Sequence, residues 1–135
     1  MKNLFKKLFS SSKLGEDGLT QVQREAMVDL LFYCMYADNS IAAKEDEIIA
    51  RTVDQFNWDP RVSYDAFTAR SIANARAVKE SPASRADFLA VVAERLATPA
   101  TKARTMALCR KIFAADGDVS AAEQELLLDL QKHLA

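Results

Sequence analysis

The chain has 135 residues, of which half are apolar and about a quarter are charged, and its net charge is −1. This length suits one domain with a substantial core, and the composition is that of an ordinary globular protein. No apolar run approaches the length of a membrane span, and the start lacks the continuous apolar stretch and cleavage site of a secretory signal.

The first eighteen residues differ in character from the rest. Apolar residues at helical spacing alternate with lysines, and a linker containing Ser and Gly follows at residues 10–18. The apolar set is Leu4, Phe5, Leu8 and Phe9, and the lysines are Lys2, Lys6 and Lys7. Such a segment is typical of a weak anchor on an anionic membrane surface, and the alternative is a segment that is disordered or docks on the domain. The chain therefore divides into a basic amphipathic segment with its linker, 1–18, and a helical domain, 19–135.

Helix signals then follow one another, and no segment shows the strict alternation of a β-strand. Thr20 and Gln23 match a capping box, which predicts a helix to about residue 36 that is apolar on nearly every face except at Asp29. A second helix is expected at about 43–56. Asp59 followed by Pro60 predicts the start of one or two further helices that reach about residue 79.

The second half continues in the same way. Ser81-Pro82 breaks the chain, Ser84 is predicted to open the next helix, and Thr98-Pro99 starts another that ends near residue 114. The last helix is expected at about 121–134. With three glycines and three prolines in all, the prediction is an all-α, single-domain bundle of six to seven helices. The two cysteines, Cys34 and Cys109, fall inside apolar helical runs and are expected to be buried, reduced core thiols.

The most informative feature is a short segment that occurs twice. Both copies contain Ala-Asp, two variable residues, Ile or Val, three variable residues and Glu. The first copy begins at Ala37 and the second at Ala115, a constant offset of 78 residues. Each copy follows one apolar helical run and opens another. The chain is therefore predicted to contain an internally duplicated helix-loop-helix, with a carboxylate before and after each loop.

These carboxylates form a candidate metal site. They are Asp38 and Glu45 in the first copy and Asp116, Asp118 and Glu123 in the second. Hard oxygen ligands suit Ca²⁺, Mg²⁺ or Mn²⁺, and Zn²⁺ is not expected because no His or Cys accompanies them in the repeat. The site is not an EF-hand, because the twelfth position counted from Asp116 is Leu127, where that loop needs a Glu.

The same repeat also has a purely structural interpretation. Ser120 and Glu123 match a capping box, and Val119 is expected to anchor its loop in the core. In the first copy Ala42 replaces the capping serine, so helix capping explains Glu45 less well. Both interpretations remain open from the sequence.

Charge is segregated along the chain despite its small net value. Residues 16–59 carry ten acidic and three basic side chains, and residues 114–135 carry five acidic and one basic. Residues 60–113 carry ten basic and four acidic side chains. If the two copies of the repeat pack together they form an acidic pole, although solvated helix faces explain the pattern equally well.

The two copies, in this order in a helical chain, resemble the TerB-like family, which is associated with bacterial tellurite resistance. The resemblance covers about residues 20–134. It implies an all-α domain of about seven helices without known catalytic activity, whose acidic loop residues chelate a divalent metal, in membrane-associated stress-response complexes. By position the implied ligands are Asp38, Glu45, Asp116 and Glu123, and the first copy departs from the pattern at Asn39-Ser40.

The sequence offers little for catalysis or for nucleic-acid binding. The only histidine, His133, lies two residues from the end, and no glycine-rich phosphate loop occurs. The basic middle lacks interleaved exposed aromatic residues. We therefore expect a cytoplasmic, non-enzymatic module that binds a divalent metal, peripheral at the inner membrane face if its first segment binds lipid. The alternative is a protein-interaction or scaffold domain whose repeated acids only cap helices, and a small metalloenzyme is the third possibility.

Overall fold

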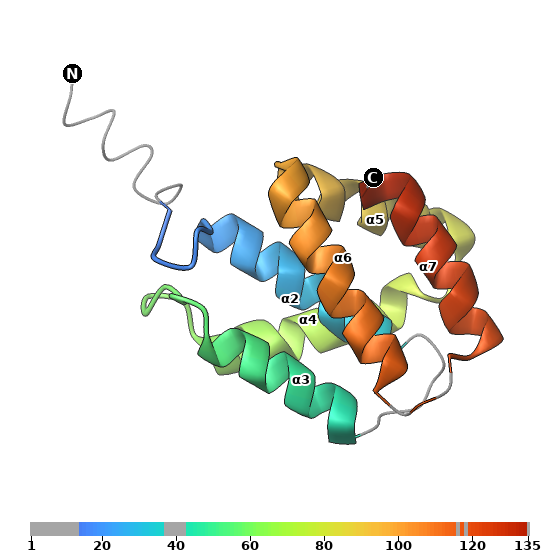
Figure 1. The fold of residues 1–135 in the computed structure, drawn as a ribbon, viewed down its shortest axis with the longest axis horizontal. Coiled ribbons are helices and arrows are strands. Elements are labelled where there is room, and N and C mark those ends of the chain that lie inside the picture. Colours follow the sequence, from blue (N-terminus) through green and yellow to red (C-terminus); the bar gives the residue numbers. More distant parts are fainter. Residues whose placement is uncertain (1–13, 37–42, 116, 118, 135) are drawn as a thin grey trace.

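The computed structural model describes residues 14–36, 43–115, 117 and 119–134. Within these ranges the chain forms one helical domain of six α-helices and no strand (Figure 1). The helices are α2 (Gln21–Met35), α3 (Ala43–Asp54), α4 (Tyr64–Val78), α5 (Pro82–Leu96), α6 (Pro99–Ala114) and α7 (Ala121–Leu134). The prediction of an all-α, single-domain bundle is confirmed.

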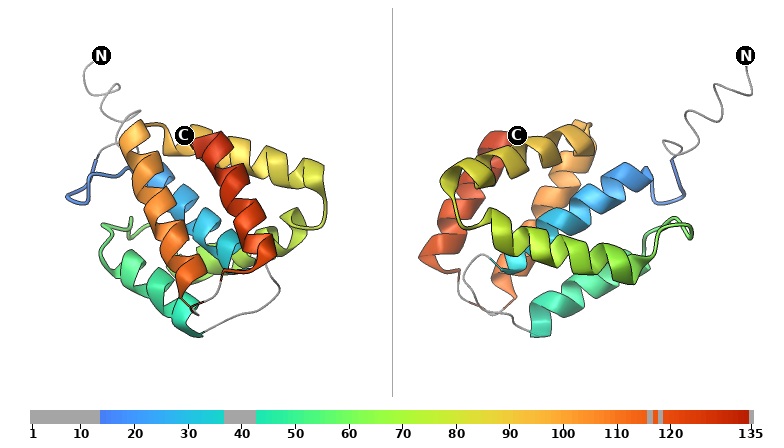
Figure 2. Two further views of the ribbon diagram at one scale, coloured as in Figure 1. Left: turned by 45° about the vertical axis from the view of Figure 1, so that its right-hand side comes forward. Right: turned by 180° about the vertical axis from the view of Figure 1, so that it is seen from behind.

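Helix α2 lies at the centre of the bundle. It contacts α3, α4, α5 and α6, while α7 packs on α5 and α6 (Figure 1, Figure 2). Its start is the predicted capping box: the Thr20 hydroxyl accepts from the Gln23 N–H at 3.1 Å, and the Gln23 side chain accepts from the Thr20 N–H at 2.9 Å. Nearly every residue of α2 is buried, as its apolar faces require.

The one acidic residue of the central part of α2 connects two neighbouring helices. The Asp29 carboxylate accepts a 2.6 Å hydrogen bond from the Ser71 hydroxyl on α4. It also forms a 3.1 Å ion pair with Arg95 on α5. A carboxylate inside an apolar helix needs such partners, because leaving it desolvated and unpaired is costly. Asp29 therefore fixes how α4 and α5 sit on α2.

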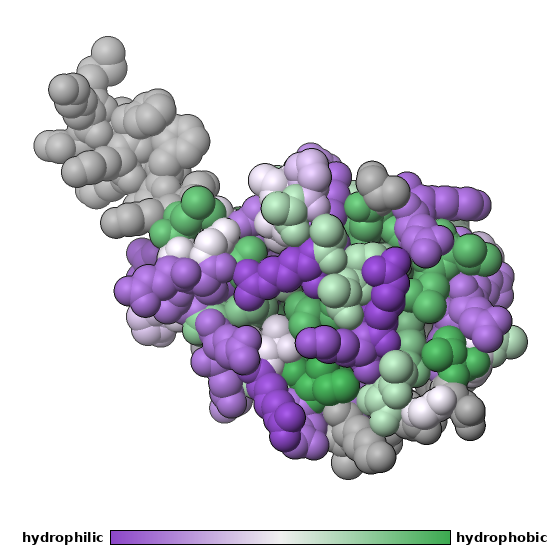
Figure 3. All heavy atoms as spheres, viewed as in Figure 1, coloured by the Kyte–Doolittle hydropathy of each residue, from purple (hydrophilic) through white to green (hydrophobic). Residues whose placement is uncertain are grey.

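The outer helices are amphipathic in the ordinary way. Hydrophilic side chains cover the outer sides of α3 and α6, and hydrophobic residues reach the surface between them (Figure 3). No helix in the described part of the chain is long and apolar enough to cross a membrane.

Two predicted helix starts are wrong. Asp59-Pro60 opens a turn instead of a helix, because the Asp59 carboxylate accepts from the Arg61 N–H at 2.9 Å and so closes a local turn. Helix α4 begins after Ser63, whose hydroxyl accepts from the Ala66 N–H. Helix α5 begins at Pro82, with Ser81 as its cap; the predicted Ser84 lies inside the first turn and donates its N–H to Ser81.

The segment before α2, predicted to be a linker, is tied to the domain by a buried ion pair. Asp17 accepts from Nε and Nη2 of Arg24 at 2.8 and 2.9 Å, and only 3% of the Asp17 side chain and 5% of the Arg24 side chain are exposed. The Asn57 N–H also donates to Asp17, and the Asp17 N–H donates to Asn57. Burial alone would raise the pKa of Asp17, but hydrogen bonds from Arg24 and from the N–H groups of Asn57 and Leu19 outweigh it and lower that pKa to about 2.

The junction between α5 and α6 contains a strained residue. Ala97 has φ 70° and ψ −55°, and the Thr98 N–H donates to the Leu96 carbonyl at 2.8 Å, which together define a classic γ-turn. The Gln23 side chain donates to the same carbonyl at 2.9 Å. This conformation is strained for a residue with a Cβ, whereas glycine adopts it without strain.

We expect Ala97→Gly to raise the free energy of unfolding by about 1 kcal/mol, because it relieves positive-φ strain at an exposed site. Urea denaturation of both chains measures the change. Ala103→Gly, at an exposed site inside α6, is the matched control and is expected to lower stability by about 1 kcal/mol. Equal losses in the two variants would contradict strain at Ala97.

Candidate functional site

Four helix ends meet at one end of the bundle. The C-terminal ends of α2 and α6 and the N-terminal ends of α3 and α7 lie there in every view (Figure 1, Figure 2). The repeat of the sequence lies at these ends, so the site is built from the first turns of α3 and α7 and the last turns of α2 and α6.

Glu123 stands in the first turn of α7 and is 2% exposed. Its carboxylate accepts from the Ser120 N–H at 2.9 Å, and the Ser120 hydroxyl accepts from the Glu123 N–H at 3.1 Å. The capping box predicted for the second copy is therefore present. A cap at the surface does not require a buried carboxylate, so the depth of Glu123 exceeds what capping demands.

Glu45 holds the equivalent place in the first turn of α3 and is 1% exposed. Fully buried glutamates are rare in proteins unless they are paired, hydrogen-bonded or bound to a metal ion. The two glutamates, one from each copy of the repeat, are among the most completely buried large side chains of the described residues.

The Cys34 thiol of α2 is buried and has a raised pKa. Its pKa is raised well above the ordinary value, first by complete burial, then by its interaction with the Cys109 thiol and by the negative charges of Glu123 and Glu45. Cys34 and Cys109 are free and buried, as predicted, and the raised pKa keeps Cys34 a neutral thiol.

The remaining predicted ligands, Asp38, Asp116 and Asp118, lie outside the described residues. Among the residues that are described, no group of three or more His, Cys, Asp or Glu side chains is arranged to hold a metal ion. A complete site would therefore need one or more of these three aspartates beside Glu45 and Glu123. Val119, expected to anchor the second loop in the core, is 36% exposed, so that prediction is wrong.

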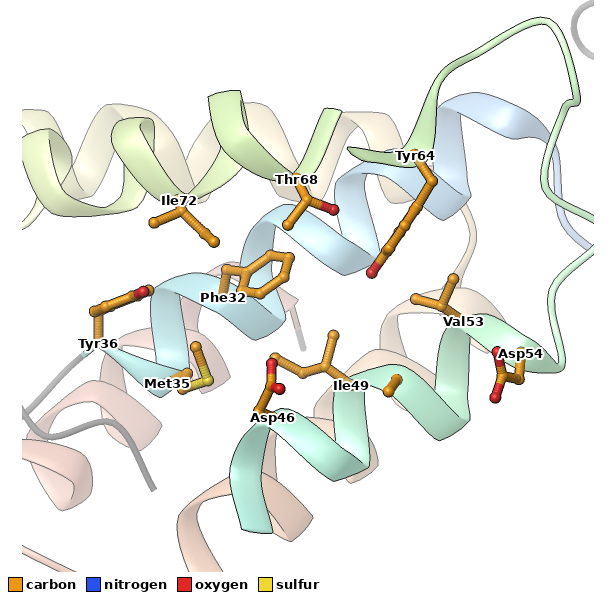
Figure 4. Close-up of a pocket in the computed structure, with 11 residues that line it drawn as sticks. Phe32, Met35, Tyr36, Asp46, Ile49, Val53, Asp54, Tyr64, Thr68 and Ile72 are labelled. Carbon is orange, nitrogen blue, oxygen red and sulfur yellow. The ribbon is translucent and has the colours of Figure 1, made fainter. Parts of the chain in front are cut away.

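A second feature is a groove between α3 and α4, with α2 as its floor (Figure 4). Its volume is about 500 Å³, in the range of small-molecule and peptide sites. Its lining residues are Phe32, Met35, Tyr36, Asp46, Ile49, Ala50, Val53, Asp54, Tyr64, Thr68 and Ile72. The walls are mainly apolar, and two carboxylates of α3 stand on one rim.

The groove has a negative electrostatic character near its acidic rim. The pKa of Tyr64 is raised, first by burial and then by the negative charges of Asp46, Asp54 and Asp65, with an opposing effect from Thr68. In Figure 4 the Tyr64 side chain points from α4 across the groove toward α3. A basic, partly apolar ligand would suit these walls.

The sequence does not predict this groove. The helical spacing of Val53, Tyr64 and Ile72 favours inward-facing positions, yet each side chain is only half-buried. The spacing of apolar residues indicates which face of a helix is inward, and it does not show whether a neighbouring helix covers that face. Asp46 and Asp54, eight residues apart on α3, were the available signal for the acidic rim.

Comparisons with known proteins give no identification. No protein-family model, no curated protein and no solved structure matches the chain.

Proposed function

We propose that the chain is a non-enzymatic, TerB-like helical module of a bacterial stress system of the tellurite-resistance type, and that its repeated acidic residues bind a divalent cation. The observation that carries the proposal is the near-complete burial of Glu45 and Glu123, which hold equivalent places in the first turns of α3 and α7. The two carboxylates are 78 residues apart in the sequence, one in each copy of the repeat, and the helix ends that carry them lie at the same end of the bundle (Figure 1).

The chemistry of the donors suits a hard cation. Carboxylate oxygens prefer Ca²⁺, Mg²⁺ or Mn²⁺, and the neutral Cys34 thiol is a poor competitor for them. Glu45 and Glu123 would supply oxygens from below the loops, and Asp38, Asp116 and Asp118 would complete the set.

A second function is supported by a different observation. The hydrogen bonds between Ser120 and Glu123 are those of a helix cap, which favours a protein-interaction or scaffold domain whose acids are structural. The groove between α3 and α4 provides such a domain with a docking surface. In either case we propose a cytoplasmic location.

Glu123→Gln separates the two functions. Glutamine keeps an oxygen that can accept from the Ser120 N–H, as Gln23 does in the capping box of α2, but it removes the charge that would bind a cation. If the repeat binds metal, we expect saturable amide shifts in the first turns of α3 and α7 during Ca²⁺, Mg²⁺ or Mn²⁺ titration by NMR. Glu123→Gln should then weaken the affinity at least about tenfold.

Glu125→Gln is the matched control, because it removes the same charge two residues further along at an exposed position. It should leave the affinity unchanged. Flat titrations through millimolar metal, with Glu123→Gln as stable as the parent chain, would reject the metal site and leave the scaffold function. Equal weakening by both variants would indicate diffuse attraction to an acidic surface instead of a site.

A further inference from the structure

The groove between α3 and α4 has an apolar interior that only partly closes. Met35 and Ile49 are buried at its base, while Val53, Tyr64 and Ile72 remain half-buried along its walls. Figure 4 shows these side chains facing the space between the two helices. Helices α3 and α4 each pack on α2, and the connection between them lies at the end of the groove near Asp54 and Tyr64.

The chain enters the domain beside that same end. Gly15 lies so close to Asn57 that a Cβ on it would come within 3.1 Å of the Asn57 Cβ. The mutual hydrogen bonds of Asp17 and Asn57, at 2.8 and 2.9 Å, hold this crossing in place. Because Asn57 belongs to the connection between α3 and α4, the described part of the chain starts next to that end of the groove.

The length of the preceding segment, residues 1–13, matches the groove. Tyr64 and Ile72, which line it, are eight residues apart on α4, or about 12 Å along the helix axis. Residues 2–9 would span about 12 Å as a helix, and residues 10–14 reach up to roughly 16 Å when extended. The linker is therefore long enough to return the segment along the groove.

The chemistry of the segment matches as well. Its sequence places Leu4, Phe5, Leu8 and Phe9 at helical spacing, with Lys2, Lys6 and Lys7 between them. An amphipathic helix docks by laying its apolar face into such a groove. Asp46 and Asp54 stand on the rim as opposite charges for the lysines.

We propose that the groove between α3 and α4 is the docking site of the chain's own basic amphipathic segment, residues 1–13. The apolar side chains of the segment fill the groove above Phe32 and Ile49, and its lysines face Asp46 and Asp54. Burial of a few apolar side chains is opposed by the cost of ordering the segment, and the two are of similar size, so the docked state is exchangeable.

The test compares amide spectra of the full chain with those of a variant carrying Leu4→Ser, Phe5→Ser, Leu8→Ser and Phe9→Ser. We expect shift changes concentrated on Val53, Thr68 and Ile72. The control variant carries Val91→Ser and Leu128→Ser, which remove exposed apolar side chains on α5 and α7, and should leave the groove amides in place. Groove amides that are identical in the parent and the first variant would overturn the proposal.

A second variant tests the site from the other side. Ala50→Trp places a large side chain at an exposed position in the groove, and Ala107→Trp does the same on α6 away from it. We expect the amide signals of residues 4–9 to move to their positions in a free peptide of residues 1–13 with Ala50→Trp only. Movement in neither variant, or in both, would count against the groove.

Two further outcomes assign the segment elsewhere. Groove shifts that vanish on dilution would mean that the segment enters a second copy of the chain, which contradicts docking within one molecule. The segment would be a membrane anchor instead if the chain sedimented with anionic phospholipid vesicles and a variant carrying Lys2→Glu, Lys6→Glu and Lys7→Glu did not. In that case the amide signals of the segment in the absence of vesicles would match those of the free peptide.

Discussion

Replacing Asp17 by alanine lowers the free energy of unfolding by about 3–5 kcal/mol, because it leaves the Arg24 guanidinium buried without its partner. The substitution also removes the carboxylate that accepts from the Asn57 N–H, so the crossing of residues 15–19 over the connection between α3 and α4 is loosened. Urea denaturation of the parent and the variant measures the loss.

Asp59→Ala is the matched control for this prediction. Asp59 pairs with Arg61 at 2.8 Å, but 75% of the Arg61 side chain is exposed. An exposed pair of this kind contributes little, so Asp59→Ala should lower the free energy of unfolding much less than Asp17→Ala. Losses of similar size in the two variants would mean that burial does not strengthen the Asp17–Arg24 pair.

The same pair makes stability depend on pH. In the folded chain the pKa of Asp17 is about 2, against 3.8 for an unperturbed aspartate, so its contribution of about 2 kcal/mol is present above about pH 5. Because the folded pKa is depressed, this contribution is lost as the pH falls toward 2. The stability gap between the parent and Asp17→Ala should therefore narrow over that interval, and a constant gap would contradict the lowered pKa.

Replacing Phe113 by alanine is expected to cost about 3–5 kcal/mol, because its side chain is fully buried and the surrounding helices cannot close the space it leaves. Phe113 belongs to α6 and to the core cluster that includes α2. Thermal and urea denaturation should agree on the loss.

Leu128→Ala on α7 provides the control, since 62% of Leu128 is exposed. It should change stability by less than about 0.5 kcal/mol. If both substitutions destabilised the chain equally, the assignment of inner and outer faces on α6 and α7 would be wrong.

The sequence predicted the helices well because each has a local signal. The capping box at Thr20 and Gln23 and the limits of the last helix, Ala121–Leu134, are found where the pattern indicates. Where two local signals compete for one helix start, the sequence pattern predicts the start at the wrong residue. Asp59 and Ser63 are both possible caps, and the Asp59 side chain closes a turn with Arg61, which leaves Ser63 to start α4.

The candidate sites depend on contacts between distant residues and were predicted less completely. The repeat indicates that Glu45 and Glu123 are equivalent, but their burial follows from how the helices of the bundle pack. Likewise, the sequence places Asp17 in a linker and Arg24 in a helix. Their buried ion pair is evident only from the structure. Local patterns carry no information on such crossings.

The central position of α2 has a consequence for synthesis of the chain. A ribosome adds about 5–20 residues per second, so the roughly 80 residues between the end of α2 and the end of α6 take about 4–16 s to appear. During that time the apolar faces of α2 that later pack against α5 and α6 remain uncovered. The helix that is best protected in the finished protein is thus exposed longest on the nascent chain, where hydrophobic-segment chaperones would bind first.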